Sequence, residues 1–286
     1  MHLHAFGFDE YGLPIPPNEI TGRSPTYRSD REAMDATLAA MRAAGIVRAV
    51  ASGPIRHVTR WRAASAGTVL GGAYIGPRDP LPAIADLRRL ARTGEISVLG
   101  EFGLQYRGIS PNSPDLNRYW ALAQELDLPV GIHTGLGDAG TPYGCCPGFR
   151  ARLGNPLLLE DVLVRFPKLR LYLMHAGYPF LQETKALLTI YPQVYVDIAV
   201  LNWALPRAEF HAYLRALVDA GFGARIMFGS DQMVWPESIQ LAVAGVESAP
   251  FLTAEQKRAS FYDNAARFLR LTEAEIRQDH AVGQPQ

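Results

Sequence analysis

Short apolar runs recur along the chain and alternate with helix-like stretches. Most of these runs are continuous rather than alternating, which is typical of strands that are covered on both faces. Seven of them lie at residues 46–51, 68–75, 96–102, 129–134, 170–176, 194–200 and 225–230, and an eighth must lead into His2. Repeated β-then-α units with right-handed crossovers close most naturally into a (β/α)8 barrel, although a doubly wound open sheet shares the same local pattern.

Helix start and stop signals lie between the apolar runs. Ser29 and Glu32 form a capping box, and Ser113-Pro114 offers an N-cap followed by a first-turn proline. An apolar stripe over residues 210–218 is stopped by Gly221. Further starts at 253–256, 264 and 272–275 predict a helical cap after the barrel, with a C-terminal helix and frayed tail over 272–286.

Length and composition exclude several classes of protein. A chain of 286 residues suits a single barrel domain over residues 1–286, and its 28 basic and 28 acidic residues give no positive excess for binding nucleic acid or anionic membrane. We therefore expect a small-molecule partner, and homo-oligomerisation stays open. The sequence has no 18-residue apolar run and no signal-peptide pattern, and with two cysteines it indicates a cytoplasmic location by default.

Histidines and acidic residues gather at the C-terminal ends of the predicted strands. Side chains at i and i+2 of a strand share a face, so His2 and His4 can chelate one ion. An acidic residue that ends a buried strand costs several kcal/mol unless it is paired or bound to metal. Singly, each histidine is more often a core or surface residue, but the combination predicts a metal site. Its members are His2, His4, Glu101, His133, His175 and Asp231.

In the order and strand positions of these residues, the chain resembles the amidohydrolase superfamily, and specifically its amidohydrolase-related branch. The resemblance extends to residues 263–269, which look like the segment that closes many members. It implies a divalent metal, zinc first and manganese or another ion as alternatives, held by His2, His4 and Asp231. His133 and His175 would complete the same site or a second one. Glu101 would bridge two ions or hydrogen-bond a ligand histidine.

The resemblance also implies a mechanism. Metal-activated water would hydrolyse an amide, lactone or ester, with Asp231 as the proton carrier and a metal or His175 polarising the carbonyl. The alternative within enzymes is a mononuclear-metal, non-oxidative decarboxylase of a small carboxylic acid. A further alternative is a catalytically silent metal-binding barrel. Glu101 favours hydrolysis.

Two long connections, residues 5–28 and 136–154, follow strands and are expected to shape a substrate pocket at the catalytic face. Arg150 and Arg152 could clamp a substrate carboxylate, although a solvated loop arginine is the commoner situation. Aromatic residues after later strands could line the pocket, although packing is the commoner role of each; they are Tyr106, Tyr143, Tyr178, Trp203 and Trp235.

Two features remain open. Cys145 and Cys146 could form a vicinal disulfide or a soft metal site, but two small buried residues are the preferred interpretation. The His2 pair begins almost at the first residue, so strand one has almost nothing ahead of it. Either the natural start lies upstream, with room for a targeting segment, or the barrel tolerates a short first strand.

Overall fold

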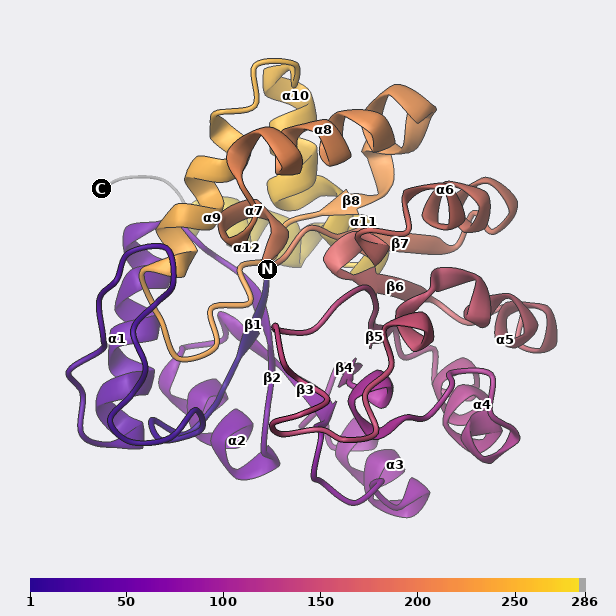
Figure 1. Cartoon of the computed structure of the whole chain (residues 1–286), viewed down its shortest axis with the longest axis horizontal. Coiled ribbons are helices and arrows are strands. Elements are labelled where there is room, and N and C mark those ends of the chain that lie inside the picture. Colours follow the sequence, from indigo (N-terminus) through magenta and orange to yellow (C-terminus); the bar gives the residue numbers. More distant parts are fainter. Residues whose placement is uncertain (283–286) are drawn as a thin grey trace.

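A computed structural model describes residues 1–282 and contains one eight-stranded parallel sheet in which each strand pairs with the next along the chain (Figure 1). The sheet curls with helices around its outside, which confirms the expected (β/α)8 fold. The strands are shorter than the apolar runs that predicted them. They are β1 (His2–His4), β2 (Ala49–Ser52), β3 (Val69–Ile75), β4 (Val98–Phe102), β5 (Val130–His133), β6 (Leu171–Met174), β7 (Val194–Asp197) and β8 (Ile226–Met227).

Several helices begin where the sequence indicates. Ser29 Oγ accepts a hydrogen bond from the backbone N–H of Glu32, but the Glu32 carboxylate reaches back to the N–H of Arg28 instead of completing the box. The helices are α1 (Asp30–Ala43), α2 (Ile55–Ala64), α3 (Ile84–Arg92), α4 (Asn117–Glu125), α5 (Glu160–Arg165), α6 (Leu181–Ile190), α7 (Leu201–Ala204), α8 (Arg207–Leu217), α9 (Ser238–Glu247), α10 (Ala254–Arg258), α11 (Asn264–Leu269) and α12 (Glu273–Val282). None in the described part of the chain is long and apolar enough to cross a membrane.

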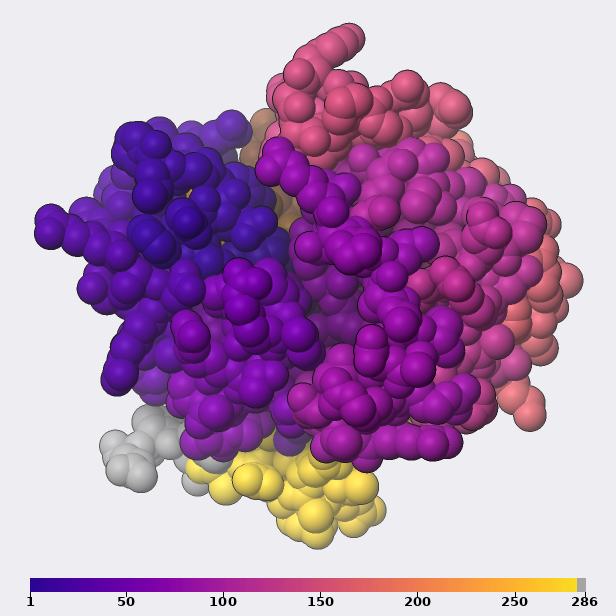
Figure 2. All heavy atoms as spheres, turned by 90° about the horizontal axis from the view of Figure 1, so that it is seen from below, coloured from indigo at the N-terminus to yellow at the C-terminus, as the bar shows by residue number. Residues whose placement is uncertain are grey.

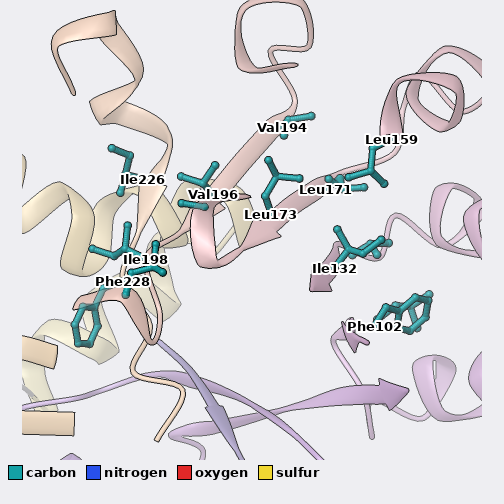
Figure 3. Packing of buried hydrophobic residues seen from close by; sticks show 14 of the residues in the cluster. Phe102, Ile132, Leu159, Leu171, Leu173, Val194, Val196, Ile198, Ile226 and Phe228 are labelled. Atoms are coloured by element: carbon teal, nitrogen blue, oxygen red, sulfur yellow. The ribbon is translucent and has the colours of Figure 1, made fainter. Parts of the chain in front are cut away.

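The pleat of the strands divides the core into two layers. Leu171 and Leu173 of β6 pack outward with Val194 and Val196 of β7 (Figure 3). Tyr172, between the two leucines, belongs instead to a separate cluster inside the barrel. Because side chains alternate between the faces of a strand, apolar residues at every position bury both faces. The continuous apolar runs in the sequence therefore reflect this double burial.

The C-terminal helices close the end of the barrel where the strands begin. Phe268 of α11 packs against the inward-facing rings of Tyr172 and Tyr195, and Asp279 of α12 pairs with Arg48 just before β2 at 2.8 Å. In Figure 2 these helices (yellow) lie opposite the segment before residue 30 (indigo) and the loop near residue 145 (pink). The cap thus leaves the other end of the barrel open. Helix α12 includes Ala281 and Val282, and residues 283–286 of the expected tail lie outside the described part.

A side-chain amide completes the junction between the last strand and the first. The backbone N–H of Ser230 donates to the carbonyl of His2 at 3.0 Å. The fully buried Gln232 then accepts from the N–H of His4 at 3.1 Å and donates to the carbonyl of His4 at 2.7 Å. Gln232 therefore replaces the ladder that a longer β8 would supply, and it fixes the backbone of His4.

We predict that Gln232→Ala lowers the free energy of unfolding by about 2 to 4 kcal/mol, because it leaves a buried donor and a buried acceptor of His4 unpaired. Urea denaturation with a chelator present measures this change without a contribution from metal binding. Gln193→Ala is the control, because Gln193 makes a single exposed contact with the Pro167 carbonyl and should change stability by less than about 1 kcal/mol. Equal effects of the two substitutions would contradict the role assigned to Gln232.

Candidate metal centre

Four predicted ligands meet at the open end of the barrel. His4 Nε2 lies 2.8 Å from Asp231 Oδ1 and 3.1 Å from Glu101 Oε2, and His2 Nε2 lies 3.6 Å from the same Glu101 oxygen. Each of these residues is between 3% and 5% exposed. All their ligand atoms lie within 4.8 Å of one another. These four residues form the first group.

A second group shares Glu101 with the first. It consists of Glu101, His133 and His175, whose ligand atoms also lie within 4.8 Å of one another. His175 Nε2 is 4.0 Å from Glu101 Oε1 and 3.8 Å from Asp231 Oδ2. The structure thus brings all six predicted residues together, with Glu101 between two clusters of nitrogen and oxygen atoms.

Asp197, at the end of β7, hydrogen-bonds to the backbone of His175 and lies beside the ring of His2. Its Oδ1 accepts hydrogen bonds from the backbone N–H groups of His175 and Ala199, and its Oδ2 lies 3.5 Å from His2 Nδ1. The Nδ1 of His175 in turn lies 3.1 Å from the carbonyl of Ala199. A carbonyl can only accept, so His175 carries its proton on Nδ1 and presents Nε2 to the site. Contacts of this kind commonly fix the tautomer of a metal-ligating histidine.

His133 is held in the same way by residues that follow β4. The side-chain nitrogen of Gln105 donates to the carbonyl of Gly135, which leaves its Oε1 to accept from His133 Nδ1 at 3.0 Å. The Nε2 of His133 faces into the site and lies 3.1 Å from the hydroxyl of Tyr106. Tyr106 therefore occupies the position from which an ion or a substrate would approach this nitrogen.

An irregularity in β4 turns Glu101 into the barrel. Leu99 pairs with Val130 and Phe102 with Ile132, so three steps along β4 correspond to two along β5. Leu99 and Phe102 both pack in the outer core layer. With strict alternation Glu101 would face outward, since it lies two residues after Leu99. The extra residue re-aims the carboxylate, as β-bulges next to active sites often do.

The backbone is also unusual where β6 and β8 end. His175 and Ala176 have φ values of 59° and 47°, and Asp231 has a φ of 48°. For residues other than glycine this left-handed conformation costs about 1 to 2 kcal/mol each. Gly135, just after β5, has a φ of 84°, and a Cβ there would lie 2.2 Å from the carbonyl oxygen of Tyr178. These turns direct the side chains at the strand ends toward one centre.

The buried carboxylates and imidazoles perturb one another strongly. Burial opposes the charged forms, but Asp231 and Glu101 raise the pKa of His4 to about 10, and His4 lowers the pKa of Glu101 to about 2. Burial and the charge of His175 lower the pKa of His133 to about 4. The carboxylates thus stay ionised at neutral pH and attract positive charge.

Unpaired polar atoms show that the residues fit a divalent ion. Among residues 1–282, His2 Nε2, Glu101 Oε2 and Asp231 Oδ1 are buried and have no hydrogen-bond partner. Asp231 Oδ1 nevertheless lies 2.8 Å from His4 Nε2, so the angle and not the distance excludes a hydrogen bond. The lone pairs converge on a shared volume. Nitrogen and oxygen donors in this arrangement suit zinc or a similar metal.

A cavity of about 640 Å³ opens above the two groups. His4, Glu101, His133, His175 and Asp231 lie at its base. Its walls come from the loops after the strands, and the residues of those loops and strand ends that line it are Phe6, Asp9, Glu10, Tyr11, Gly12, Tyr74, Pro77, Arg78, Asp79, Tyr106, Asp138, Thr141, Cys145 and Met233. This volume suits a small molecule.

The five residues predicted to bind substrate do not line this cavity. Arg150 and Arg152 are exposed, and the guanidinium of Arg150 donates to carbonyls of its own loop. Tyr143 is 94% exposed, and Tyr178 contacts Glu209 and Tyr213 outside the cavity. Trp203 is buried beneath the site, where its indole N–H donates to the carbonyl of Ser230. Of the other two aromatic residues proposed, Tyr106 lines the cavity, whereas Trp235 packs behind Tyr11.

The preferred interpretation of the cysteine pair is wrong. Cys145 and Cys146 form a disulfide with an S–S distance of 2.07 Å, and Cys145 is exposed at the cavity wall while Cys146 is buried. Backbone hydrogen bonds from Tyr143 to Gly140 and from Cys146 to Thr141 coil the loop tightly at this point. The turn holds the two sulfur atoms side by side, which adjacency in the sequence alone does not require.

Asp197 and Gln105 are functional candidates that the sequence reasoning missed. Asp197 ends an apolar strand, and this same signal identified Glu101. The strand was expected to continue to residue 200, so Asp197 was not recognised as a strand end. Gln105 follows β4 in a loop and has no comparable signal. Phe6 and the acidic loop residues reach the cavity through the path of their loops, and Tyr74 reaches it from the end of β3.

Solved structures with the same fold include enzymes of two kinds. A probable 2-pyrone-4,6-dicarboxylic acid hydrolase from Acinetobacter baumannii has a TM-score of 0.65 at 13% identity, with 94% of this chain and 98% of that chain covered. The 5-carboxyvanillate decarboxylase from Novosphingobium aromaticivorans, complexed with manganese, has a TM-score of 0.61 at 14% identity and covers 87% of this chain and 85% of its own. At such low identity these likenesses show the fold.

Sequence similarity identifies the family to which the chain belongs. Protein fluG from Emericella nidulans is 26% identical over an alignment of 134 positions, which covers 43% of this chain and 15% of that protein. The chain therefore matches a small part of this much longer relative. The amidohydrolase family model matches residues 1–271, nearly the whole chain and all six residues of the two groups. By this match, the chain belongs to the amidohydrolase family.

Proposed function

We propose that this protein is a metal-dependent hydrolase that cleaves an amide, lactone or ester bond of a small molecule. The observation that carries the proposal is the position of Glu101, which belongs to both groups of ligand atoms. A carboxylate shared in this way can bridge two ions. We propose zinc in both places, with manganese as the alternative, because nitrogen and carboxylate ligands suit either metal.

The protein's own groups would then have distinct tasks. His2, His4 and Asp231 would hold one ion, His133 and His175 the other, and Glu101 both. Such an ion lowers the pKa of water from about 16 to about 7 and so supplies hydroxide at neutral pH. Asp231 Oδ2, which faces His175 at 3.8 Å, would receive the proton of the attacking water and pass it to the leaving group. The ligand groups at the cavity base are buried, and a lower local dielectric strengthens such interactions.

Decarboxylation of a small carboxylic acid remains the second candidate. The manganese-containing decarboxylase with the same fold favours it, and one ion held by His2, His4 and Asp231 would suffice. In that case His175 would contact the substrate directly, and Glu101 would only position a ligand histidine. The number of ions per chain therefore separates the two candidates.

We predict that His133→Ala reduces metal content and abolishes hydrolysis while leaving the barrel folded, because His133 contacts Gln105 and Tyr106 at the site and not the core layers. Metal analysis and circular dichroism measure the two effects. His211→Ala is the matched control, since the ring of His211 on α8 contacts the carbonyl of Gly245 and the rings of Phe210 and Phe251, outside both ligand groups. Full metal content in His133→Ala would exclude His133 as a ligand.

Asp197→Asn should weaken metal binding by roughly 10- to 100-fold without removing any proposed ligand. An amide at this position presents an N–H toward His2 Nδ1 or toward the backbone N–H groups of His175 and Ala199, so one ligand loses its orientation. Titration of the metal-free protein with zinc in a competing chelator gives the affinity. An unchanged affinity would mean that the ligand histidines are oriented by their packing alone.

Glu101→Gln and Asp231→Asn separate hydrolysis from decarboxylation. If Glu101 bridges two ions, Glu101→Gln lowers the metal content from about two to about one per chain, because a neutral amide cannot hold two cations. If Asp231 carries the proton, Asp231→Asn keeps at least one ion but lowers turnover by roughly 10² to 10⁴. The assay is a panel of lactones, esters and amides beside aromatic acids, with release of carbon dioxide monitored.

One result would reverse the proposal. A wild-type protein that binds one ion, is indifferent to Glu101→Gln and releases carbon dioxide from an acid is a decarboxylase. A protein that binds metal through these residues but turns over neither class of compound would be the metal-binding barrel without activity.

A further inference from the structure

The walls of the cavity carry an excess of negative charge that the metal centre does not use. Four acidic residues and one arginine line it above the base, a net charge of −3 when all are ionised; they are Asp9, Glu10, Asp79, Asp138 and Arg78. The carboxylates come from three separate loops, those after β1, β3 and β5. Their meeting at one opening is therefore a property of the fold and not of one acidic stretch.

No cation in the described part of the chain pairs directly with these carboxylates, and Arg56 acts on Glu10 only from a longer distance. None of the four forms a salt bridge within 4.0 Å, and none of their side chains makes a hydrogen bond there. Arg107 donates to the backbone carbonyl of Asp79 and not to its carboxylate. Partial burial and neighbouring acidic groups raise the pKa of Glu10 and of Asp138, although His4 and Arg56 partly offset the rise at Glu10 and His175 does so at Asp138.

Aromatic rings form one corner of the same cavity. Phe6 stacks on the imidazole of His4 with centroids 4.1 Å apart, and the rings of Tyr74 and Tyr11 lie 5.6 Å and 6.5 Å from Phe6. Asp9 and Glu10 follow Phe6 in the loop after β1. Faces of aromatic rings attract organic cations, most strongly where water is excluded. Acidic walls and an aromatic corner thus favour the same kind of ligand.

At the base of the cavity, buried polar atoms face the same space. Glu101 Oε2 and Asp231 Oδ1, on side chains that are 5% and 4% exposed, have no hydrogen-bond partner among the described residues. A ligand that fills the cavity would approach the candidate metal centre with one end while its remainder contacts the walls. The acidic and aromatic walls therefore belong to one ligand cavity.

From this combination we infer that the substrate is an organic cation: a small ester, amide or lactone that carries a protonated amine or a quaternary ammonium group. The inference rests on the proposed hydrolytic function for the bond that is cleaved, but the charge preference follows from the cavity walls alone. The ammonium group would lie against Phe6, Tyr11 and Tyr74 and near the four carboxylates. The carbonyl would point toward the candidate metal centre.

The test uses three inert probes that differ in charge, with metal-loaded protein and isothermal titration calorimetry. Benzyltrimethylammonium should bind about tenfold more tightly than benzyl alcohol, and benzylsulfonate should bind more weakly than either. A quaternary ammonium group cannot coordinate a metal, so its affinity reports the walls. Raising the salt concentration should weaken binding of the cation and leave benzyl alcohol unchanged.

Substitutions in the walls should move this preference in both directions. Glu10→Gln and Asp138→Asn are each expected to weaken binding of the cation by about threefold, and Arg78→Gln to strengthen it by a similar factor. Asp219→Asn is the control, because it removes an exposed carboxylate at the other end of the barrel, before β8. Equal affinity for the three probes, or equal effects of Asp138→Asn and Asp219→Asn, would overturn the inference.

A measurement of turnover tests the hydrolytic function separately from the charge preference of the cavity. Three phenyl esters with ammonium, neutral and sulfonate groups at the same distance from the carbonyl should be hydrolysed in that order of kcat/KM. If none is hydrolysed while benzyltrimethylammonium binds as expected, the hydrolytic function fails and the charge preference stands. If the sulfonate ester is the best substrate, the inference fails and hydrolysis stands.

Discussion

Two buried carboxylates, Glu101 and Asp231, share the mouth of the barrel with four imidazoles, and no lysine or arginine pairs with either of them within residues 1–282. Burying such charges without compensation costs several kcal/mol. Protons on the imidazoles supply part of the compensation. In agreement with this, the carboxylates raise the pKa of His4 to about 10 and also raise the pKa of His175. A divalent ion would replace these protons. Its binding would release them, so its affinity should rise with pH.

The surrounding fold keeps these charges in place against the tendency of the backbone to relax. Glu101 faces inward only because of the irregularity in β4, and His175 and Asp231 do so from left-handed backbone positions. Asp197 and Gln232 then hydrogen-bond to the backbone of His175 and His4. Strain of this size persists only when the neighbouring structure determines it. The barrel around the strand ends therefore acts as a rigid support for the ligand groups.

The sequence predicts the strands and the six candidate ligands because both leave local signals. Double burial gives continuous apolar runs, and a histidine or carboxylate at the end of such a run stands out, as Glu101 and His133 do. Asp197 carries the same signal, but the strand end was misplaced by three residues. The two long connections at 5–28 and 136–154 were expected to shape the pocket, and residues of both line it, but which of their side chains face the cavity was not predictable. Arg150 and Tyr143 lie in a loop of the right length after the right strand, yet hydrogen bonds within that loop turn them away from the site.

The charge of the cavity and the choice of reaction are linked by electrostatics. A substrate for decarboxylation must bring a carboxylate past Asp9, Glu10, Asp79 and Asp138, and Arg78 is the one basic residue beside them in the described walls above the base. A cavity lined by charges of one sign concentrates their electrostatic field and so changes the local concentration of charged ligands. The acidic walls therefore oppose entry of an anion, even where a metal ion at the base would attract it. An uncharged carbonyl group carries no such penalty, and a cationic substituent gains from the walls. The acidic walls therefore support the proposed hydrolytic function by an argument that is separate from Glu101, since they act on the part of the ligand that does not react.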